Sequence, residues 1–289
     1  MSPLPDLSAG APATVRPIPP DHLRIPASIG RFRYPVLGTD TDFRDRIQLS
    51  ALFSICQEVA SLQAQAAGLG ADRLDSRGMR WLLLRLSVRM LRLPLWRETL
   101  VIDSWPRGYD RLLSLRDFYL SDGDGKPLGG ATTSWVLVDA DTHRPVRRNG
   151  LGPEFDIATE SGTLGFDAPR LPDTPIPEGA SPDLVRTARF SDIDRNGHLN
   201  NTRYIAWSVD ALHVRAAAES APAPEHAGSD RLLDLPVLGA DVQYLSEVRP
   251  GESLALHVLP WPGDPGARAV ESRKSDGTPA FRARLLLVQ

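Results

Sequence analysis

The chain has 289 residues, of which 42% are hydrophobic and 24% are charged, a composition typical of a globular protein that can bury a core. Its formal net charge of −3 argues against wholesale nucleic-acid binding, and its single cysteine, Cys56, excludes a disulfide or a cysteine-rich metal site within the chain. No apolar run approaches the roughly 20 residues that span a membrane, and the N-terminus lacks the basic start and apolar core of a secretory signal. We therefore expect a cytoplasmic protein with no nucleic-acid or membrane partner.

The predicted elements begin after a Pro- and Ala-rich stretch, residues 1–30, which we expect to be a flexible tail. An extended segment, RFRYPVLGTDTD, leads to RIQLSALFSICQEVASLQAQAAGLG, where apolar residues at helical spacing predict a long helix with Gly68 or Gly70 as its stop. Four strand-like runs follow, separated by turn signals: MRWLLLRLSVRMLRL, ETLVIDSWPRG, RLLSLRDFYLSD and GGATTSWVLVDAD. Residues 151–180 are rich in Pro, Gly and acidic residues, and we interpret them as a linker.

The same order of elements returns in the second half of the chain. A strand and turn are predicted at LVRTARFSDID, a helix at NNTRYIAWSVDALHVRAAA, and strands at DVQYLSEV, ESLALHVLPW, ARAVESRKSDG and PAFRARLLLVQ. Asp194 follows Asp42 by 152 residues, and Glu252 follows Glu98 by 154. The chain therefore carries an internal duplication of one structural plan.

The duplication predicts an α+β fold of two tandem hotdog domains, at residues 31–150 and 181–289. Each domain would be an antiparallel sheet wrapped around a central helix. Two such sheets can pair edge to edge, which protects an exposed edge strand, so we expect the two copies to form a pseudo-dimer. Pairing of whole chains into a homodimer stays open.

The stretch FSDIDRNGHLNNTRYIAW, just before the second helix, admits a calcium-binding interpretation. Asp192, Asp194 and Asn196 match the first three oxygen-ligand positions of an EF-hand loop, and Gly197 matches its turn. The twelfth position, however, is Arg203 where a bidentate carboxylate is required, and the preceding segment is strand-like where a helix is required. Calcium binding is therefore disfavoured.

The same stretch also admits a hydrolytic interpretation. In an extended segment Asp194, Asn196 and His198 would project to one side, where a carboxylate and an imidazole can activate a water molecule. The helix that follows, capped by Asn200 or Asn201, would offer backbone N–H groups to the oxyanion formed when a thioester is attacked. These groups favour acyl transfer to water.

The motif DIDRNGHLNNTRYIAW resembles the active-site motif of the acyl-ACP thioesterases, plant and bacterial double-hotdog enzymes that hydrolyse acyl-acyl carrier protein. The likeness begins near Phe32 and includes QEVA in the first helix, Trp81 and Arg85 in the following strand, and TTSWVLVDADTHRPVR before the linker. The resemblance implies an acidic carrier protein with a fatty acyl chain as partner, and no metal or organic cofactor. It makes Trp81 and Arg85 candidates for substrate binding.

By this resemblance, the family's catalytic residues fall on Asp194, Asn196, His198 and Glu247. His198 would be the general acid and base, Asp194 would orient the water or the imidazole ring, and Asn196 would hold the thioester carbonyl or the water. Glu247 would be a second carboxylate near the water. Val248 stands where the family has a cysteine once held to be the nucleophile, so attack by water is implied.

The first copy carries Arg44 and Arg46 at the positions of Asn196 and His198, and an arginine that stays protonated cannot act as a general base. We therefore expect one active site per chain, in the C-terminal domain. The N-terminal domain would bind the acyl chain through its apolar helix and the run WLLLRLSV. A basic face for docking the acidic carrier protein is expected from six arginines: Arg80, Arg85, Arg89, Arg92, Arg97 and Arg107.

Two alternatives remain open. A hotdog hydrolase acting on acyl-CoA shares the D-x-D-x-x-G-H-x-N-N pattern, and only the fused length and the glutamate of YLSEV favour the carrier-protein substrate. A non-catalytic acyl-binding module is disfavoured by Asp194, Asn196 and His198, because a binder gains nothing from water-activating groups in an apolar slot.

Overall fold

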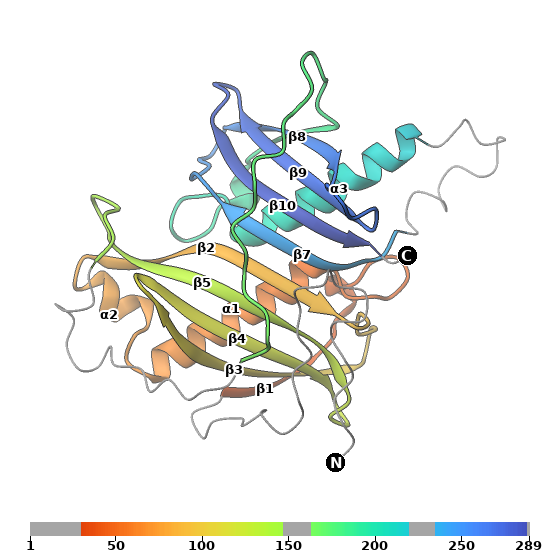
Figure 1. Ribbon diagram of the computed structural model, residues 1–289. Coiled ribbons are helices and arrows are strands. Elements are labelled where there is room, and N and C mark those ends of the chain that lie inside the picture. The colour runs from red at the N-terminus through yellow and green to blue at the C-terminus, as the bar shows by residue number, and fades with distance from the viewer. Residues whose placement is uncertain (1–29, 147–162, 220–234, 288–289) are drawn as a thin grey trace. The chain divides into compact units, whose positions relative to one another are not determined.

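The computed structural model describes residues 30–146, 163–219 and 235–287 (Figure 1). The chain divides into two compact units, Met1–Ala168 and Pro169–Gln289, and each is described by itself. Residues 1–29 of the predicted tail and 151–162 of the predicted linker lie outside the described residues. None of the helices in the described ranges is long and apolar enough to cross a membrane.

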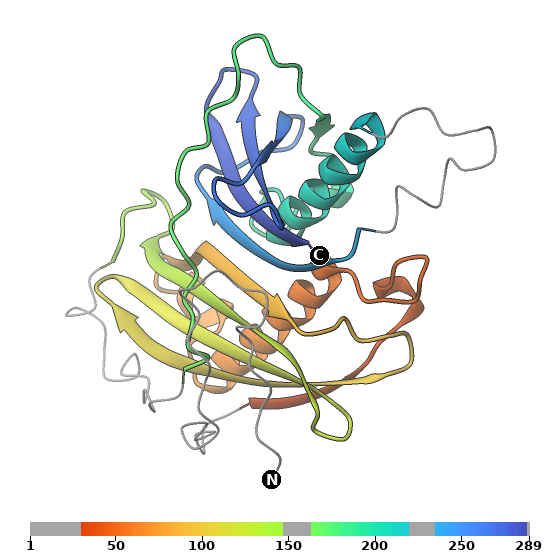
Figure 2. The ribbon, with the colours of Figure 1, turned by 45° about the vertical axis from the view of Figure 1, so that its right-hand side comes forward.

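The N-terminal unit is one antiparallel sheet with a long helix along one face (Figure 2). Its strands lie in the order β1-β3-β4-β5-β2. The elements are β1 (Gly30–Pro35), α1 (Leu49–Ala66), α2 (Ala71–Asp75), β2 (Met79–Met90), β3 (Thr99–Asp110), β4 (Leu113–Asp122) and β5 (Pro127–Asp139). The predicted helix is confirmed, and Gly68 at φ 73° follows its end in the left-handed conformation that favours glycine. The short α2 was not predicted.

The C-terminal unit repeats this plan. Its strand order, β6-β8-β9-β10-β7, equals that of the first unit when the strands are matched in chain order. The elements are β6 (Leu184–Thr187), α3 (Asn201–Glu219), β7 (Val237–Tyr244), β8 (Ser253–Pro260), β9 (Ala267–Lys274) and β10 (Pro279–Leu287). The duplication and the two hotdog units are thereby confirmed. The edge-to-edge pairing of the two units stays a prediction.

The two long helices bury the same positions. In α1 the buried side chains recur at helical spacing. Five of them have a buried counterpart in α3 that lies 152 residues later, the same offset that separates Asp42 from Asp194. The pairs are Leu52 and Tyr204, Phe53 and Ile205, Cys56 and Ser208, Val59 and Ala211, and Ala60 and Leu212. This spacing places one apolar stripe on the sheet. Burial raises the pKa of the Cys56 thiol to about 12, so this residue is an inert part of the core.

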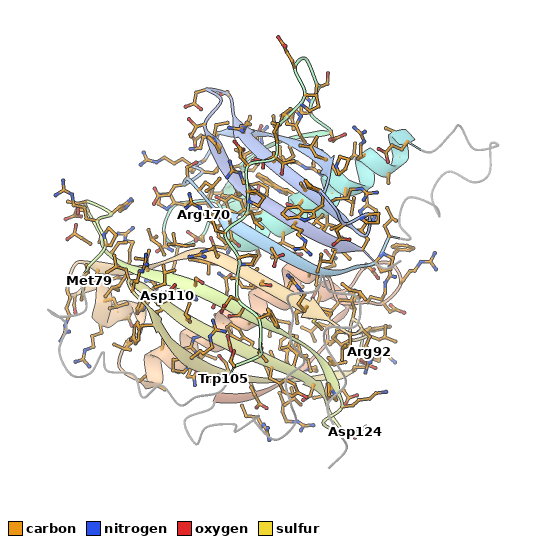
Figure 3. All side chains as sticks on the ribbon, viewed as in Figure 1. Met79, Arg92, Trp105, Asp110, Asp124 and Arg170 are labelled. Atoms are coloured by element: carbon orange, nitrogen blue, oxygen red, sulfur yellow. The ribbon has the colours of Figure 1, made fainter. Side chains whose placement is uncertain are left out.

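The described part of the linker is anchored to the first unit by buried polar groups. Asp117, fully buried on β4, accepts a hydrogen bond from the Leu164 N–H at 3.2 Å. Arg107 donates to the Phe166 carbonyl at 3.2 Å and contacts the Asp167 carboxylate. Leu164 and Phe166 pack in one buried cluster with Trp105, labelled in Figure 3, and Tyr119. This part of the linker therefore belongs to the core of the unit.

The second unit holds its stretch of linker in the same way. Glu271 on β9 lies 154 residues after Asp117, is equally buried, and accepts a hydrogen bond from the Thr174 N–H at 2.9 Å. Gln243 accepts the Leu171 N–H at 2.8 Å. Burial raises the pKa of Asp117 to about 6 and also raises the pKa of Glu271. The duplicated plan thus includes a buried carboxylate that binds the linker backbone.

The buried carboxylate of Asp117 predicts a pH-dependent stability. Its pKa is about 6 in the folded chain and near 3.8 when exposed, so its stabilising contribution is fully present below 3.8 and is lost as the pH rises through 6. Asp117→Asn carries no such proton. Relative to wild type, its free energy of unfolding should therefore rise across this window by on the order of 3 kcal/mol. Urea unfolding on both sides of the window measures the difference. The control is Asp124→Asn, at the exposed β4–β5 turn (Figure 3), and parallel curves for the two variants would contradict the prediction.

Candidate active site

The motif forms a tight turn before α3. The Asp194 N–H donates to the His198 carbonyl at 2.8 Å, and the Gly197 N–H donates to the Asp194 carbonyl at 3.0 Å. Gly197 adopts φ 80°, and Ile193 and Leu199 form an antiparallel bridge that closes the turn. The expected extended segment with alternating side chains is therefore wrong. The backbone hydrogen bonds of residues 194–198 join groups within the loop and not to a neighbouring strand. The polar residues are therefore brought together by a turn.

The Asp194 carboxylate faces this turn. It accepts the Asn196 N–H at 2.8 Å and lies 3.5 Å from both the His198 N–H and the Asn196 side-chain amide. Asp194 and His198 are half-buried, whereas Asn196 is exposed. Asp194 thus shapes the loop that presents His198, and the amide of Asn196 is left accessible to a ligand.

The imidazole of His198 meets Glu247. His198 Nε2 lies 3.2 Å from Glu247 Oε2, and the two side chains are 19% and 30% exposed. Glu247 lies in the loop between β7 and β8, three residues after β7 ends at Tyr244. The sequence had predicted a strand that reaches Val248, and that prediction is wrong. The structure therefore brings together two predicted site residues that are 49 positions apart, and it pairs the ring with Glu247 where Asp194 had been considered.

Two further contacts join the loops that carry this pair. The Leu199 N–H donates to the Val248 carbonyl at 2.8 Å, which ties the turn of His198 to the loop of Glu247. Behind them, Tyr204 packs edge to face on Tyr244, with ring centroids 5.2 Å apart. Burial raises the pKa of Tyr204, and the nearby charges of Asp194 and Glu247 raise it further. Tyr204 was missed as a site neighbour, since in sequence it is only the first aromatic residue of an amphipathic helix.

The start of α3 uses its N–H groups internally. Asn200 Oδ1 accepts the Thr202 N–H at 2.9 Å, so Asn200 is the cap, and the Asn200 carbonyl accepts the Arg203 N–H at 2.9 Å. These two donors are therefore engaged, and the expectation that the helix start binds the oxyanion is not met by them. The side-chain amide of Asn196 is exposed, and one of its two N–H groups faces Asp194 Oδ2 at 3.5 Å.

Asp192 braces the loop before α3. Its carboxylate accepts the Arg189 N–H at 3.0 Å and pairs with Arg203 at 3.2 Å. Arg203, at the twelfth position of the EF-hand pattern, thus neutralises Asp192 at the first position. Across the described ranges, no group of three His, Cys, Asp or Glu side chains is arranged to hold a metal ion.

Calcium is accordingly expected to leave the melting temperature unchanged. A bound ion would stabilise the folded chain by an amount that grows with the logarithm of the ratio of its concentration to the dissociation constant. Thermal unfolding with millimolar calcium, compared with the same concentration of magnesium and with chelator, measures this. An upward shift specific to calcium would revive the EF-hand interpretation despite the Asp192–Arg203 pair.

The first copy keeps the backbone of the turn. The Asp42 carboxylate accepts the Arg44 N–H at 2.8 Å and the Arg46 N–H at 3.0 Å, and Asp45 takes the left-handed place of Gly197 with φ 60°. Arg46, in the place of His198, pairs with Asp42 at 2.9 Å, and Leu93 stands 154 residues before Glu247. The first copy therefore has the scaffold without the His–Glu pair.

The substrate-binding candidates lie on β2 of the N-terminal unit. Trp81 packs against a buried cluster that includes Leu74 and Leu137, and Arg85 Nη1 lies 3.4 Å from the Ala168 carbonyl. Their contact with substrate stays a prediction. In the run WLLLRLSV, Leu83, Leu86 and Val88 are buried as core.

Three of the six arginines expected on a docking face are held within the unit. Arg89 is buried with its guanidinium 5.7 Å from the Phe166 ring centroid. Arg92 pairs with Glu98 at 2.7 Å and with Asp122 at 3.3 Å, and Arg107 binds the linker. These three do not form a free basic face.

Comparison with known proteins places this geometry in context. Residues 30–149 match the family model of the acyl-ACP thioesterase N-terminal domain, and residues 181–261 match that of the C-terminal domain. The oleoyl-acyl carrier protein thioesterase 2 of Arabidopsis thaliana is 28% identical over 57% of this chain and 48% of its own length. A palmitoyl-acyl carrier protein thioesterase of Gossypium hirsutum is 25% identical over 89% of this chain and 68% of its own. The chain spans about half the length of most of the curated relatives it matches.

Solved structures share the fold. An acyl-ACP thioesterase from Bacteroides thetaiotaomicron superimposes with a TM-score of 0.72 at 22% identity, covering 90% of this chain and 98% of that one. The 12:0-ACP thioesterase from Umbellularia californica gives 0.72 at 19% identity, covering 91% and 98%. At these identities the likeness establishes the double-hotdog fold alone.

Proposed function

Because this chain belongs to the acyl-ACP thioesterase family, we propose that it hydrolyses fatty acyl-acyl carrier protein to free fatty acid and holo-carrier protein. The observation that carries the proposal is the 3.2 Å contact between His198 Nε2 and Glu247 Oε2, on loops tied by the Leu199–Val248 hydrogen bond. A half-buried imidazole beside a carboxylate is suited to moving protons at neutral pH. We propose the cytoplasm as its location.

The reaction needs one water and no further reactant. The His198–Glu247 pair takes a proton from the water as its oxygen attacks the thioester carbonyl. The exposed amide of Asn196 donates to the carbonyl oxygen as negative charge develops there. The carbon–sulfur bond then breaks, and the pair returns the proton to the leaving thiolate of the carrier. Asp194 contributes by closing the turn that presents His198.

One active site per chain is proposed, in the C-terminal unit. The first copy has Arg46 and Leu93 where the second has His198 and Glu247, so neither of these two positions holds a group that can act as the base. We propose that the N-terminal unit serves the acyl chain, through the apolar surface around α1 and β2. Val248 is fully buried and has no nucleophilic group, which supports attack by water.

The test is hydrolysis of a ladder of acyl-acyl carrier proteins beside the same acyl-CoAs. Preferential cleavage of the carrier-protein thioesters is the expected result, and the ladder supplies the preferred chain length. Preference for CoA would keep the chemistry of the site and change the substrate. Binding of acyl chains without cleavage would make the protein an acyl-binding module and overturn the proposal.

A further inference from the structure

Lysine is rare in this chain, and one of its two lysines lies beside the site. The chain has 31 arginines but only Lys126 and Lys274 as lysines. Lys274 ends β9, and its side chain is 15% exposed. Its Nζ lies 2.5 Å from the Glu247 carbonyl and 3.2 Å from each oxygen of the Glu252 carboxylate. An ammonium has three N–H donors on one compact centre, and here each has an acceptor; a flat guanidinium cannot converge its donors in this way.

These acceptors belong to the loop that carries the catalytic carboxylate. Lys274 holds the carbonyl of Glu247, and the Leu199 N–H holds the carbonyl of the next residue, Val248. Two successive carbonyls of the loop, those of Glu247 and Val248, are therefore held by hydrogen bonds. The donor of the first lies on β9, and the donor of the second lies in the turn of His198. Glu252 also accepts the Arg249 N–H at 2.6 Å, which closes the loop from its far end. The Glu247 side chain leaves the backbone at the Cα directly before the first of these two fixed carbonyls.

The first copy shows the same loop closed differently. Glu98, the counterpart of Glu252, accepts the Leu95 N–H at 3.0 Å, as Glu252 accepts that of Arg249. Its cation, however, is Arg92, which pairs with Glu98 and with Asp122, two carboxylates. With the offset of 154 residues, the first copy has Leu120 in the place of Lys274, Arg92 in the place of Ser246 and Leu93 in the place of Glu247. The lysine at this place accompanies the copy that has the glutamate.

We infer that Lys274 is a positioning residue for the reaction: by holding the Glu247 main chain, it keeps the Glu247 carboxylate against His198. The inference rests on the proposed function. A misplacement of a reacting group by about 1 Å can lower the rate about 100-fold, so a loop freed at this carbonyl should slow the chemical step while substrate binding is kept.

The experiment compares Lys274→Leu with Lys126→Leu, which makes the same change in charge at an exposed turn of the other unit. Lys274→Leu should lower kcat by about 10- to 100-fold with KM little changed, and Lys126→Leu should match wild type. The double variant Ser246→Arg/Lys274→Leu places the residues of the first copy, Arg92 and Leu120, at these two positions and returns a cation to Glu252. It should recover the thermal stability that Lys274→Leu loses, while kcat stays low.

Each possible result either supports the positioning role of Lys274 or overturns it. A kcat restored in the double variant would mean that Lys274 only neutralises Glu252, and the positioning role would be overturned. An unchanged kcat in Lys274→Leu, beside an inactive His198→Ala, would overturn that role and leave the proposed function standing. A wild-type protein that cleaves no thioester would overturn the proposed function itself, and with it this role.

Discussion

His198→Ala is expected to lower kcat/KM for acyl-acyl carrier protein hydrolysis by about 1000-fold, within the range that general acid–base catalysis contributes. In the proposed reaction the imidazole is the group that takes the proton from water and returns it to sulfur, with Glu247 as its partner. The side chain is partly exposed, and the backbone of the turn is held by bonds that alanine keeps, so the fold should be retained.

Steady-state kinetics measure this effect, with circular dichroism and thermal unfolding to verify the fold. The matched control is His213→Ala on α3, whose ring lies 2.8 Å from the carbonyl of Val209 in its own helix. That variant should retain wild-type activity. Full activity in His198→Ala would remove this residue from the chemistry and leave Glu247 to act without it.

Glu247→Gln is expected to lower kcat by about 100-fold, because the amide keeps the size of the side chain but cannot accept a proton from water. Its effect should depend on His198. If the two residues act as one unit, the double variant His198→Ala/Glu247→Gln should be no slower than the slower single variant. The double-mutant cycle therefore tests the 3.2 Å contact directly.

The control for this substitution is Glu178→Gln, at an exposed position of the linker, which should leave kcat unchanged. Effects of the two single variants that multiply in the double variant would show that His198 and Glu247 contribute independently. In that case the contact between them would be structural.

Comparison of the two copies shows how a duplicated scaffold can differ in chemistry through few side chains. The turns of Asp42 and Asp194 share their backbone hydrogen bonds, and both units hold linker backbone through a buried carboxylate. Three of the differences involve the proposed His–Glu pair: His198 against Arg46, Glu247 against Leu93, and Lys274 against Leu120. All three lie at the His–Glu pair or hold its backbone.

The two long helices, the strands, the duplication and the position of the candidate loop could all be read from the amino-acid sequence, whereas the short α2 could not. Helical spacing in α1 and α3 identified their buried faces, since periodicity reports which side of an element leaves water. The offsets of 152 and 154 residues found the repeat, and the motif resemblance identified the family. These features are local in the chain or are copies of a local pattern.

Which side chains contact one another followed from the folded chain and not from the sequence pattern. The pairing of His198 with Glu247, the bond from Lys274 to the Glu247 carbonyl, and the burial of Leu164 against Trp105 each join distant segments. The turn at Asp194 also overrode the alternation that its spacing predicted, because its hydrogen bonds close within the loop and not along a strand. Contacts between loops depend on where the strands end and how the sheet brings those ends together, and no local periodicity carries that information.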